Sequence, residues 1–379
     1  MAIKISRTNG PKLIGTKSPL ENLNNFLKKK FYKPDLEAIR ATYATYAAHR
    51  LSGSPVWLMI VAPPGSMKTE QIEALEGLSG VHLIDQITAN TFISGQIDDP
   101  KKPRSKPASL LHRIGSDCIL IYPDFSTILA MRQDKKASIL ADMRRIYDGK
   151  LRKEYGTSDS PLERIWEGRI TFLVAATPDV DRHYGIFQTL GERFLMVRSH
   201  RPGGIEAALM AMNQDNKEVK EHLRNAVHSL LNGLPHFDPT LSPQLQLRIA
   251  ALTEFAVLGR TQVPRDGYSK GIIYVPEPEA ATRLAQQLAQ LAKGSALLDR
   301  RKQVAEMDCR LVQRVAFDCI PATRRKILDA CIANEELTKL NIPDSTWSYA
   351  VEELRFQGLM HGDKLSDLAM DLLIKGGVI

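Results

Sequence analysis

Short apolar runs rich in branched residues alternate with helix-like stretches over residues 51–205. Runs of about four to eight such residues between helical stretches are typical of buried strands in a parallel sheet. The pattern therefore predicts an α/β fold with a parallel sheet. Strands are expected at 56–61, 81–84, 118–122 and 169–176, with a further one after Arg193 and a hairpin or loop over 149–168.

Beyond Pro202 the apolar spacing changes to the 3.6-residue period of amphipathic helices. Helices are predicted within 204–231, 244–258 and 278–299, and the last has the most regular apolar stripe. We interpret that stripe as a packed core face. Residues 206–321 are therefore predicted to form an all-helical domain.

The end of the chain has the spacing of a winged helix-turn-helix. Two predicted helices are followed by a turn with Pro343 and by a third helix from Trp347. That third helix carries Arg355 as its single cation, beside Glu352 and Glu353. A helix that reads the major groove is usually basic, and units of this kind also dock proteins. The sequence therefore leaves two possible partners for this unit, DNA and a protein.

These changes of pattern divide the chain into four parts. They are a basic helical N-terminal segment (1–50), the α/β core (51–205), a helical lid domain (206–321) and the winged-helix-like domain (322–379). The basic first part is either an arm that faces nucleic acid or a solvated helical collar.

The core is organised around the loop that follows its first strand. Residues 56–70 read V-W-L-M-I-V-A-P-P-G-S-M-K-T-E. A buried strand, a turn with free backbone N–H groups and a following helix form the layout of a phosphate-binding loop. Lys68 would neutralise the β- and γ-phosphates, and the Thr69 hydroxyl would hold Mg²⁺. The spacing fits G-x-x-x-x-G-K-[ST], with Ala62 in place of the first glycine and Met67 in place of the last.

Polar residues also follow two later strands. Asp124 comes after the strand that ends at Tyr122, and Thr177 follows the strand that ends at Ala176. The carboxyl ends of parallel strands meet at one edge of a sheet, where ligands bind. Asp124 would bind Mg²⁺ or activate water there, and Thr177 would contact the γ-phosphate or the attacking water.

Composition places the chain among ordinary globular proteins. Its 379 residues, 43% hydrophobic and 25% charged, allow several domains, and no apolar run is long enough to cross a bilayer. The scattered cysteines indicate reduced thiols, and no leader peptide is apparent, so we expect a cytoplasmic protein without a membrane partner. The net charge of +8 permits a polyanionic partner.

Taken in order, these motifs resemble those of AAA+ ATPases. The similarity covers roughly residues 51–321. It is greatest to the branch of the minichromosome-maintenance helicases and MoxR-type ATPases, and to ATPases of phages and mobile elements that end in a winged helix. In that branch a small non-glycine residue commonly precedes the lysine, in the place of Met67. The resemblance implies that Thr177 is sensor 1, that Arg193 (in E-R-F) is an arginine finger for a neighbouring subunit, and that Arg283 (in A-T-R-L) is the sensor 2 arginine of the lid.

The resemblance implies an ATPase with ATP and Mg²⁺ as cofactors, assembled as a hexamer-like ring or a filament, that acts on DNA. Thr69 and Asp124 would hold the metal. DNA would contact Lys150, Arg152 and Lys153, after the Asp124 motif. The phosphates would be cradled by Pro64, Gly65, Ser66, Met67, Lys68 and Thr69.

The chain departs from the family at its second acidic motif. The family shows Asp-Glu, whereas this chain has Pro123-Asp124-Phe125. Asp124 takes the place of either the Mg²⁺ ligand or the general base, and losing a general base can slow hydrolysis by about 10² to 10⁴. An ATP-gated regulatory switch and a MoxR-type protein-remodelling chaperone with slow hydrolysis are therefore the alternatives to a DNA motor.

Overall fold

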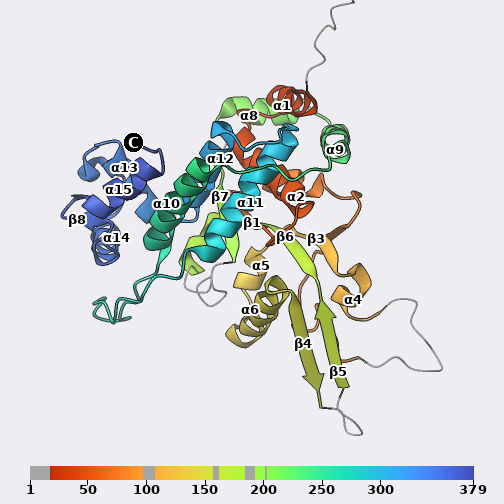
Figure 1. Cartoon of the computed structure of the whole chain (residues 1–379), viewed down its shortest axis with the longest axis horizontal. Coiled ribbons are helices and arrows are strands. Elements are labelled where there is room, and N and C mark those ends of the chain that lie inside the picture. The colour runs from red at the N-terminus through yellow and green to blue at the C-terminus, as the bar shows by residue number, and fades with distance from the viewer. Residues whose placement is uncertain (1–17, 97–106, 157–161, 184–192, 201–202) are drawn as a thin grey trace, which may run out of the picture.

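The structure is a computed structural model that describes residues 18–96, 107–156, 162–183, 193–200 and 203–379. Figure 1 shows a sheet among helices, a long hairpin that projects from the body, and a C-terminal helical unit on another side. The predicted α/β fold with a parallel sheet is confirmed.

The central sheet has five parallel strands in the order β2-β3-β6-β1-β7. Pairing of Leu58 with Leu173, and of Tyr122 with Val174, brings the carboxyl ends of β1, β6 and β3 to one edge. Nearly every side chain of these three strands is buried, as expected for a parallel sheet covered by helices. The strands are β1 (Trp57–Val61), β2 (Val81–Leu83), β3 (Asp117–Tyr122), β6 (Arg169–Ala176) and β7 (Phe194–Arg198).

Short helical elements connect these strands. The helix that follows the 62–69 loop is short: it ends at Glu73 and turns follow it, with Gly77 at a φ of 91° that favours glycine. The connecting elements are α3 (Lys68–Glu73), α4 (Leu110–Ile114), α5 (Ser126–Leu129), α6 (Gln133–Tyr147) and η1 (Pro178–His183).

An antiparallel hairpin is inserted between α6 and β6. Its strands are β4 (Lys150–Tyr155) and β5 (Leu162–Glu167). It leaves the sheet at the amino edge, where the Gly168 N–H donates to the Gly149 carbonyl at 2.9 Å, and it projects from the body in Figure 1. Of the two alternatives expected for this stretch, a hairpin or a loop, the structure shows the hairpin.

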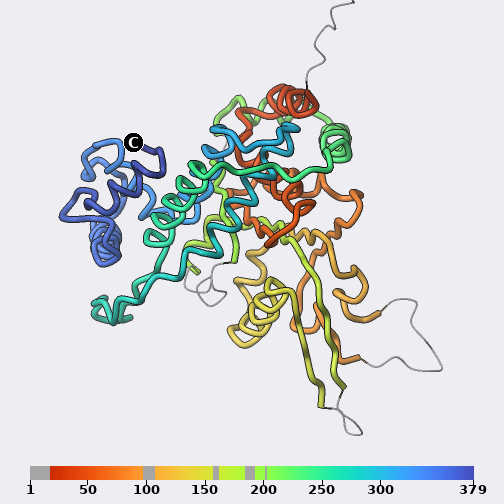
Figure 2. Tube along the Cα trace, in the orientation of Figure 1, coloured from red at the N-terminus to blue at the C-terminus, as the bar shows by residue number. Residues whose placement is uncertain are grey.

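The N-terminal helices α1 (Pro19–Lys30) and α2 (Leu36–His49) are packed into the body of the molecule. The chain trace in Figure 2 shows α2 beside α11 (Thr282–Leu298). Gly294 permits this approach, because a Cβ there would lie 2.1 Å from the Ala44 carbonyl oxygen. One hydrophobic core therefore runs across the predicted boundaries near residues 50 and 206.

The helical half differs from its prediction within residues 204–231 and at the start of the helix expected over 278–299, which begins at Thr282. The stretch 204–231 forms two helices, because Asp215 interrupts the first and caps the second by accepting the N–H groups of Lys217 and Glu218. Residues 261–281 form an extended excursion before α11. The helices are α8 (Ile205–Met212), α9 (Asn216–Asn232), α10 (Pro243–Arg260), α11 and α12 (Glu306–Asp318).

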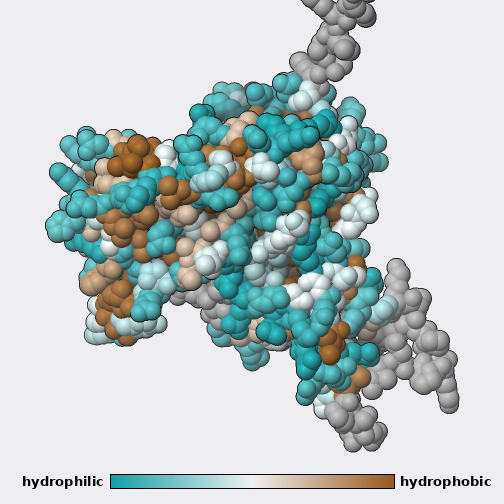
Figure 3. Space-filling view, in the orientation of Figure 1, coloured by the Kyte–Doolittle hydropathy of each residue, from teal (hydrophilic) through white to brown (hydrophobic). Residues whose placement is uncertain are grey.

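The C-terminal unit packs on α10 and α12. Arg324 is buried and donates to the carbonyls of Gly259 and Thr261 and to the Glu353 carboxylate. Figure 3 shows apolar side chains gathered over this unit, and the exposed ones include Phe356 and Ile374. Its elements are α13 (Ala322–Ile332), η2 (Leu337–Lys339), α14 (Asp344–Phe356), β8 (Met360–His361), β9 (Lys364–Leu365) and α15 (Asp367–Lys375).

Candidate functional site

The 62–69 loop turns sharply at the carboxyl end of β1. The Ala62 N–H donates to the Ala176 carbonyl at 3.1 Å, which holds the start of the loop against the end of β6. Gly65 (φ 75°) and Met67 (φ 62°) both adopt the left-handed conformation. For a residue with a side chain that conformation costs about 1–2 kcal/mol. Met67 thus adopts the backbone conformation that glycine favours, at the position where the sequence motif expects a glycine.

The end of this loop begins α3. Ser66 donates its hydroxyl to the Pro63 carbonyl, and the Gln71 N–H donates to the Met67 carbonyl at 3.1 Å. Lys68 and Thr69 follow in the first turn and are half-buried. Among the described residues no carboxylate forms an ion pair with Lys68, so its charge is available to an anion in this loop.

Asp124 lies at the same edge, two strands away. The Phe125 N–H donates to the Ala175 carbonyl at 2.8 Å, which ties the turn after β3 to the end of β6. The Asp124 side chain is exposed, and its Oδ1 accepts the Ser126 N–H at 3.1 Å. One carboxylate oxygen therefore has a backbone donor, while the group as a whole remains open to solvent.

Ser126 joins the Asp124 turn to Thr177. The Thr177 N–H donates to Ser126 Oγ at 3.3 Å, and the two hydroxyl oxygens are 3.4 Å apart. Our reading of the sequence missed Ser126. Its position two residues after an aspartate was the available signal, because such a backbone N–H commonly bonds the aspartate side chain. The structure thus brings the 62–69 loop, Asp124 and Thr177 to one edge, and adds Ser126.

A cavity of about 160 Å³ opens beside the 62–69 loop. The segment before α2 and the end of β7 form two of its walls, and α8 forms another with Ala207, Met210 and Ala211. No sequence pattern indicates this cavity, because its walls come from segments far apart in the chain. The residues that line the cavity include Lys33, Pro34, Asp35, Ala38, Gly65, Ser66, Met67, Ser199 and His200.

Arg193 and Arg283 lie at the opposite, amino edge of the sheet. Arg193 directly precedes β7, and its guanidinium bonds the Asp148 carboxylate at 2.9 and 3.0 Å. Both arginines stand over the Tyr147 ring, at 5.4 and 5.9 Å from its centroid. Glu279 approaches Arg283 at 3.9 Å. The structure therefore brings these two arginines together and separates them from the 62–69 loop of their own chain.

Burial governs the ionisation of this arginine cluster. It lowers the pKa of the Arg193 guanidinium, although Asp148 acts in the opposite direction. Burial also raises the pKa of Tyr147 to about 12, and this phenol accepts a bond from Gln287 at 2.7 Å. Only 8% of the Arg193 side chain is exposed. In a single chain Arg193 is therefore held by its own subunit.

The three hairpin cations predicted to contact DNA are each paired with a carboxylate of the same chain. Lys150 lies 2.5 Å from Glu167, and Arg152 lies 3.0 Å from Glu163. Lys153 pairs with Asp142 and donates to the Ala89 carbonyl at 3.0 Å. Carboxylates of the same chain therefore offset the charge of all three residues predicted to contact DNA.

No cluster of three or more His, Cys, Asp and Glu side chains suited to a metal occurs in the described part of the chain. Thr69 lies in the first turn of α3 and Asp124 lies in the turn after β3, and together they offer one hydroxyl and one carboxylate. This set fits Mg²⁺, which commonly takes one or two protein ligands and completes its shell with water and phosphate oxygens. A metal at this edge would therefore depend on a bound phosphate ligand.

The comparisons leave the site to be judged on its geometry. No protein-family model matches the chain, and no curated protein shows significant similarity to it. Within the described residues, no helix has the length and apolar character required to cross a membrane.

Proposed function

We propose that the protein binds ATP with Mg²⁺ at the carboxyl edge of the sheet and hydrolyses it slowly. One observation carries the proposal: the 62–69 loop, Asp124 and Thr177 meet at this edge, with a cavity for a base beside the loop. Lys68, with which no carboxylate of the described residues pairs, and the left-handed Met67 agree with a phosphate-binding turn. The resemblance to AAA+ ATPases with a P-loop core supports the same assignment.

In this proposal each residue has a separate role. Loop N–H groups from Gly65 to Thr69 cradle the phosphates, Lys68 offsets their charge, and Thr69 holds Mg²⁺. Asp124 holds the metal or orients water, and Thr177 contacts the γ-phosphate. Mg²⁺, when bound, offsets the charge that develops on the transferred phosphoryl group. Because this edge offers a single carboxylate at the β3 end, we expect slow turnover.

Binding of a fluorescent ATP analogue tests the proposal directly. Lys68→Ala is expected to weaken binding by about ten- to a hundredfold, since a hydrogen bond to a charged group contributes about 1.5–3 kcal/mol. Thr69→Ala is expected to abolish the Mg²⁺ dependence of binding. Lys135→Ala, an exposed lysine on α6, serves as the matched control. Equal affinity of the wild type and Lys68→Ala would remove the loop from the nucleotide site.

The placement of the arginines supports the proposed assembly into a ring or filament. Arg193 and Arg283 share the amino edge, opposite the 62–69 loop, so they could serve a nucleotide site only on a neighbouring copy. A head-to-tail contact of opposite edges is a heterologous interface, and such interfaces close into rings or extend into filaments. We also propose that this assembly acts on DNA.

An ATP-gated switch is the second candidate. The ion pair between buried Arg193 and half-exposed Asp148 favours it, because a transfer of this arginine to a neighbour would first break that intrachain pair. The exposed apolar side chains of the C-terminal unit, which we propose as a winged helix, suit a protein partner. Tight ATP binding with negligible turnover, unchanged by DNA, would favour the switch over the motor.

A further inference from the structure

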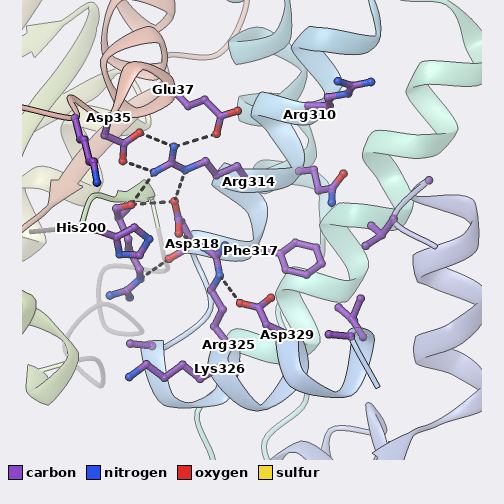
Figure 4. Close-up of a pocket in the computed structure, with 18 of the residues that line it drawn as sticks. Asp35, Glu37, His200, Arg310, Arg314, Phe317, Asp318, Arg325, Lys326 and Asp329 are labelled. Atoms are coloured by element: carbon purple, nitrogen blue, oxygen red, sulfur yellow. Dashed lines mark hydrogen bonds and ion pairs between the residues drawn. The ribbon is translucent and has the colours of Figure 1, made fainter. Parts of the chain in front are cut away.

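A second and much larger cavity, of about 1270 Å³, lies between the sheet core and the C-terminal unit. Its walls come from the end of β7, from α12 and from α13, and from the residues before α2 (Figure 4). Tyr32, Lys33, Asp35 and His200 line both this cavity and the smaller one beside the 62–69 loop. We call the larger cavity the interdomain groove.

The inner wall of the groove is an ion-pair network. Arg314 donates to both Asp35 oxygens at 2.6 and 2.5 Å and to the Arg198 carbonyl at 2.9 Å. Arg325 bonds Asp318 and lies 3.3 Å from Asp329 (Figure 4). The acidic residues that line the groove are thereby engaged with arginines of the same wall.

The remaining lining charge is positive. Lys326 is exposed, and no carboxylate lies within ion-pair distance of it among the described residues. Arg310 is 72% exposed and has one distant partner, Glu306, at 3.9 Å. At the other end of the groove, Lys33 stands over the Tyr32 ring at 5.2 Å. A concave surface with an excess of one charge concentrates counter-ions of the opposite charge.

We propose that the interdomain groove binds a single nucleic-acid strand through its phosphates. A strand of this kind is held by a positive groove with an aromatic ring on which bases stack, and Tyr32 provides such a ring. The hairpin suits this role less well, since Lys150 and Arg152 are paired within their own ribbon. The inference rests on the DNA part of the proposed function and moves the contact from the hairpin to the groove.

The test compares two charge reversals in binding of a fluorescent oligothymidine over a range of salt concentrations. Arg310→Glu with Lys326→Glu alters the groove and spares Lys33 and His200, which also line the small cavity. Lys150→Glu with Arg152→Glu alters the hairpin.

Lys339→Glu provides a matched control for the groove variant. This lysine lies on the same unit with 75% of its side chain exposed. Binding of the fluorescent ATP analogue is measured on every variant.

The groove variant is expected to bind the strand at least about tenfold more weakly at moderate salt, with the log–log salt slope reduced by about 1.4. The hairpin variant and Lys339→Glu are expected to bind like the wild type. If the groove variant binds the strand as tightly as the wild type and the hairpin variant loses binding, the groove proposal is wrong and the proposed DNA-acting role remains. A wild type that binds an acidic peptide and no DNA also overturns it. Groove-dependent DNA binding without nucleotide binding upholds the groove and defeats the ATPase proposal.

Discussion

Ser126 and Thr177, which lie 51 residues apart in the chain, connect the segments that follow β3 and β6: the Thr177 N–H donates to Ser126 Oγ at 3.3 Å. Ser126 also donates its own N–H to Asp124. A single serine therefore fixes the spacing between the proposed γ-phosphate contact and the proposed metal or water ligand. It is a positioning residue, since its contacts are to Asp124 and Thr177.

Ser126→Ala is expected to lower turnover about three- to tenfold, because the loss of one hydrogen bond costs about 0.5–1.5 kcal/mol. The Michaelis constant for ATP should change little, since the loop and the small cavity are untouched. Ser126→Thr, which keeps the hydroxyl, should restore most of the rate. Steady-state kinetics separate the two constants, with Ser348→Ala on α14 as an exposed control. A fall in thermal stability with unchanged turnover would assign Ser126 a structural role alone.

The local part of the fold could be predicted from the sequence. Strands such as residues 169–176 are continuous runs of branched and apolar residues, and burial keeps such runs extended. Asp124 and Thr177 could be placed for the same reason, because the end of a parallel strand fixes the edge at which its next residue lies. The predictions were therefore correct for features whose position depends on a single strand.

The remainder depended on contacts between distant segments. The split of 204–231 at Asp215 arises from a side-chain cap that apolar spacing does not reveal. The shared core of α2 and α11 depends on Gly294 meeting Ala44, about 250 positions earlier in the chain. The pairing of Arg193 with Asp148 likewise brings together residues from separate elements. Apolar periodicity predicts elements, whereas these features arise from their packing.

A mixing experiment tests whether Arg193 serves a neighbouring copy. Arg193→Ala and Lys68→Ala are each expected to lose most ATPase activity, as an arginine finger contributes about 10³–10⁵ in rate. Mixed in equal amounts, they should regain activity at about one site in four, where an intact Lys68 meets an intact Arg193 across a head-to-tail interface. A mixture as inactive as its components, from variants that still assemble, would show that Arg193 acts within its own chain.

Gly294→Ala is expected to destabilise the protein by about 1–3 kcal/mol through overpacking against α2. The new Cβ would lie 2.1 Å from the Ala44 carbonyl oxygen. Alanine would gain about 1 kcal/mol in helix propensity, so a net loss would show that the contact dominates. Urea unfolding measures the difference. Gly267→Ala, where a Cβ meets nothing within 4 Å, should stay within about 0.5 kcal/mol of the wild type.

Glu353→Ala is expected to loosen the C-terminal unit. Arg324 would keep its buried charge without its carboxylate, a change that costs about 3–5 kcal/mol for a buried pair. Limited proteolysis should then cleave between the helical half and residues 322–379 before other sites. Glu336→Ala removes an exposed pair with Lys339 and should cost less than about 1 kcal/mol. Equal protease resistance of the two variants would contradict the role of the Arg324–Glu353 pair in docking this unit.

His49 is expected to make stability depend on pH. Burial lowers the pKa of His49 to about 4, with repulsion from Arg169 acting in the same direction and Asp117 opposing both. Its Nδ1 lies 3.1 Å from the Thr171 hydroxyl. The unfolded chain takes up a proton near the ordinary pKa of 6.5, before the folded protein does. The contribution of His49 is therefore complete above that pH and is lost as the pH falls toward 4.

Urea unfolding midpoints at descending pH measure this loss, expected to reach at most about 3 kcal/mol. His49→Gln keeps a hydrogen-bonding side chain and removes the titration, so its midpoint should fall less steeply with acid than that of the wild type. The exposed His361→Gln should leave the slope unchanged. If the urea midpoints of the wild type and His49→Gln fall equally steeply with acid, the acid sensitivity lies in other groups. His49 would then have the same pKa in the folded and the unfolded chain.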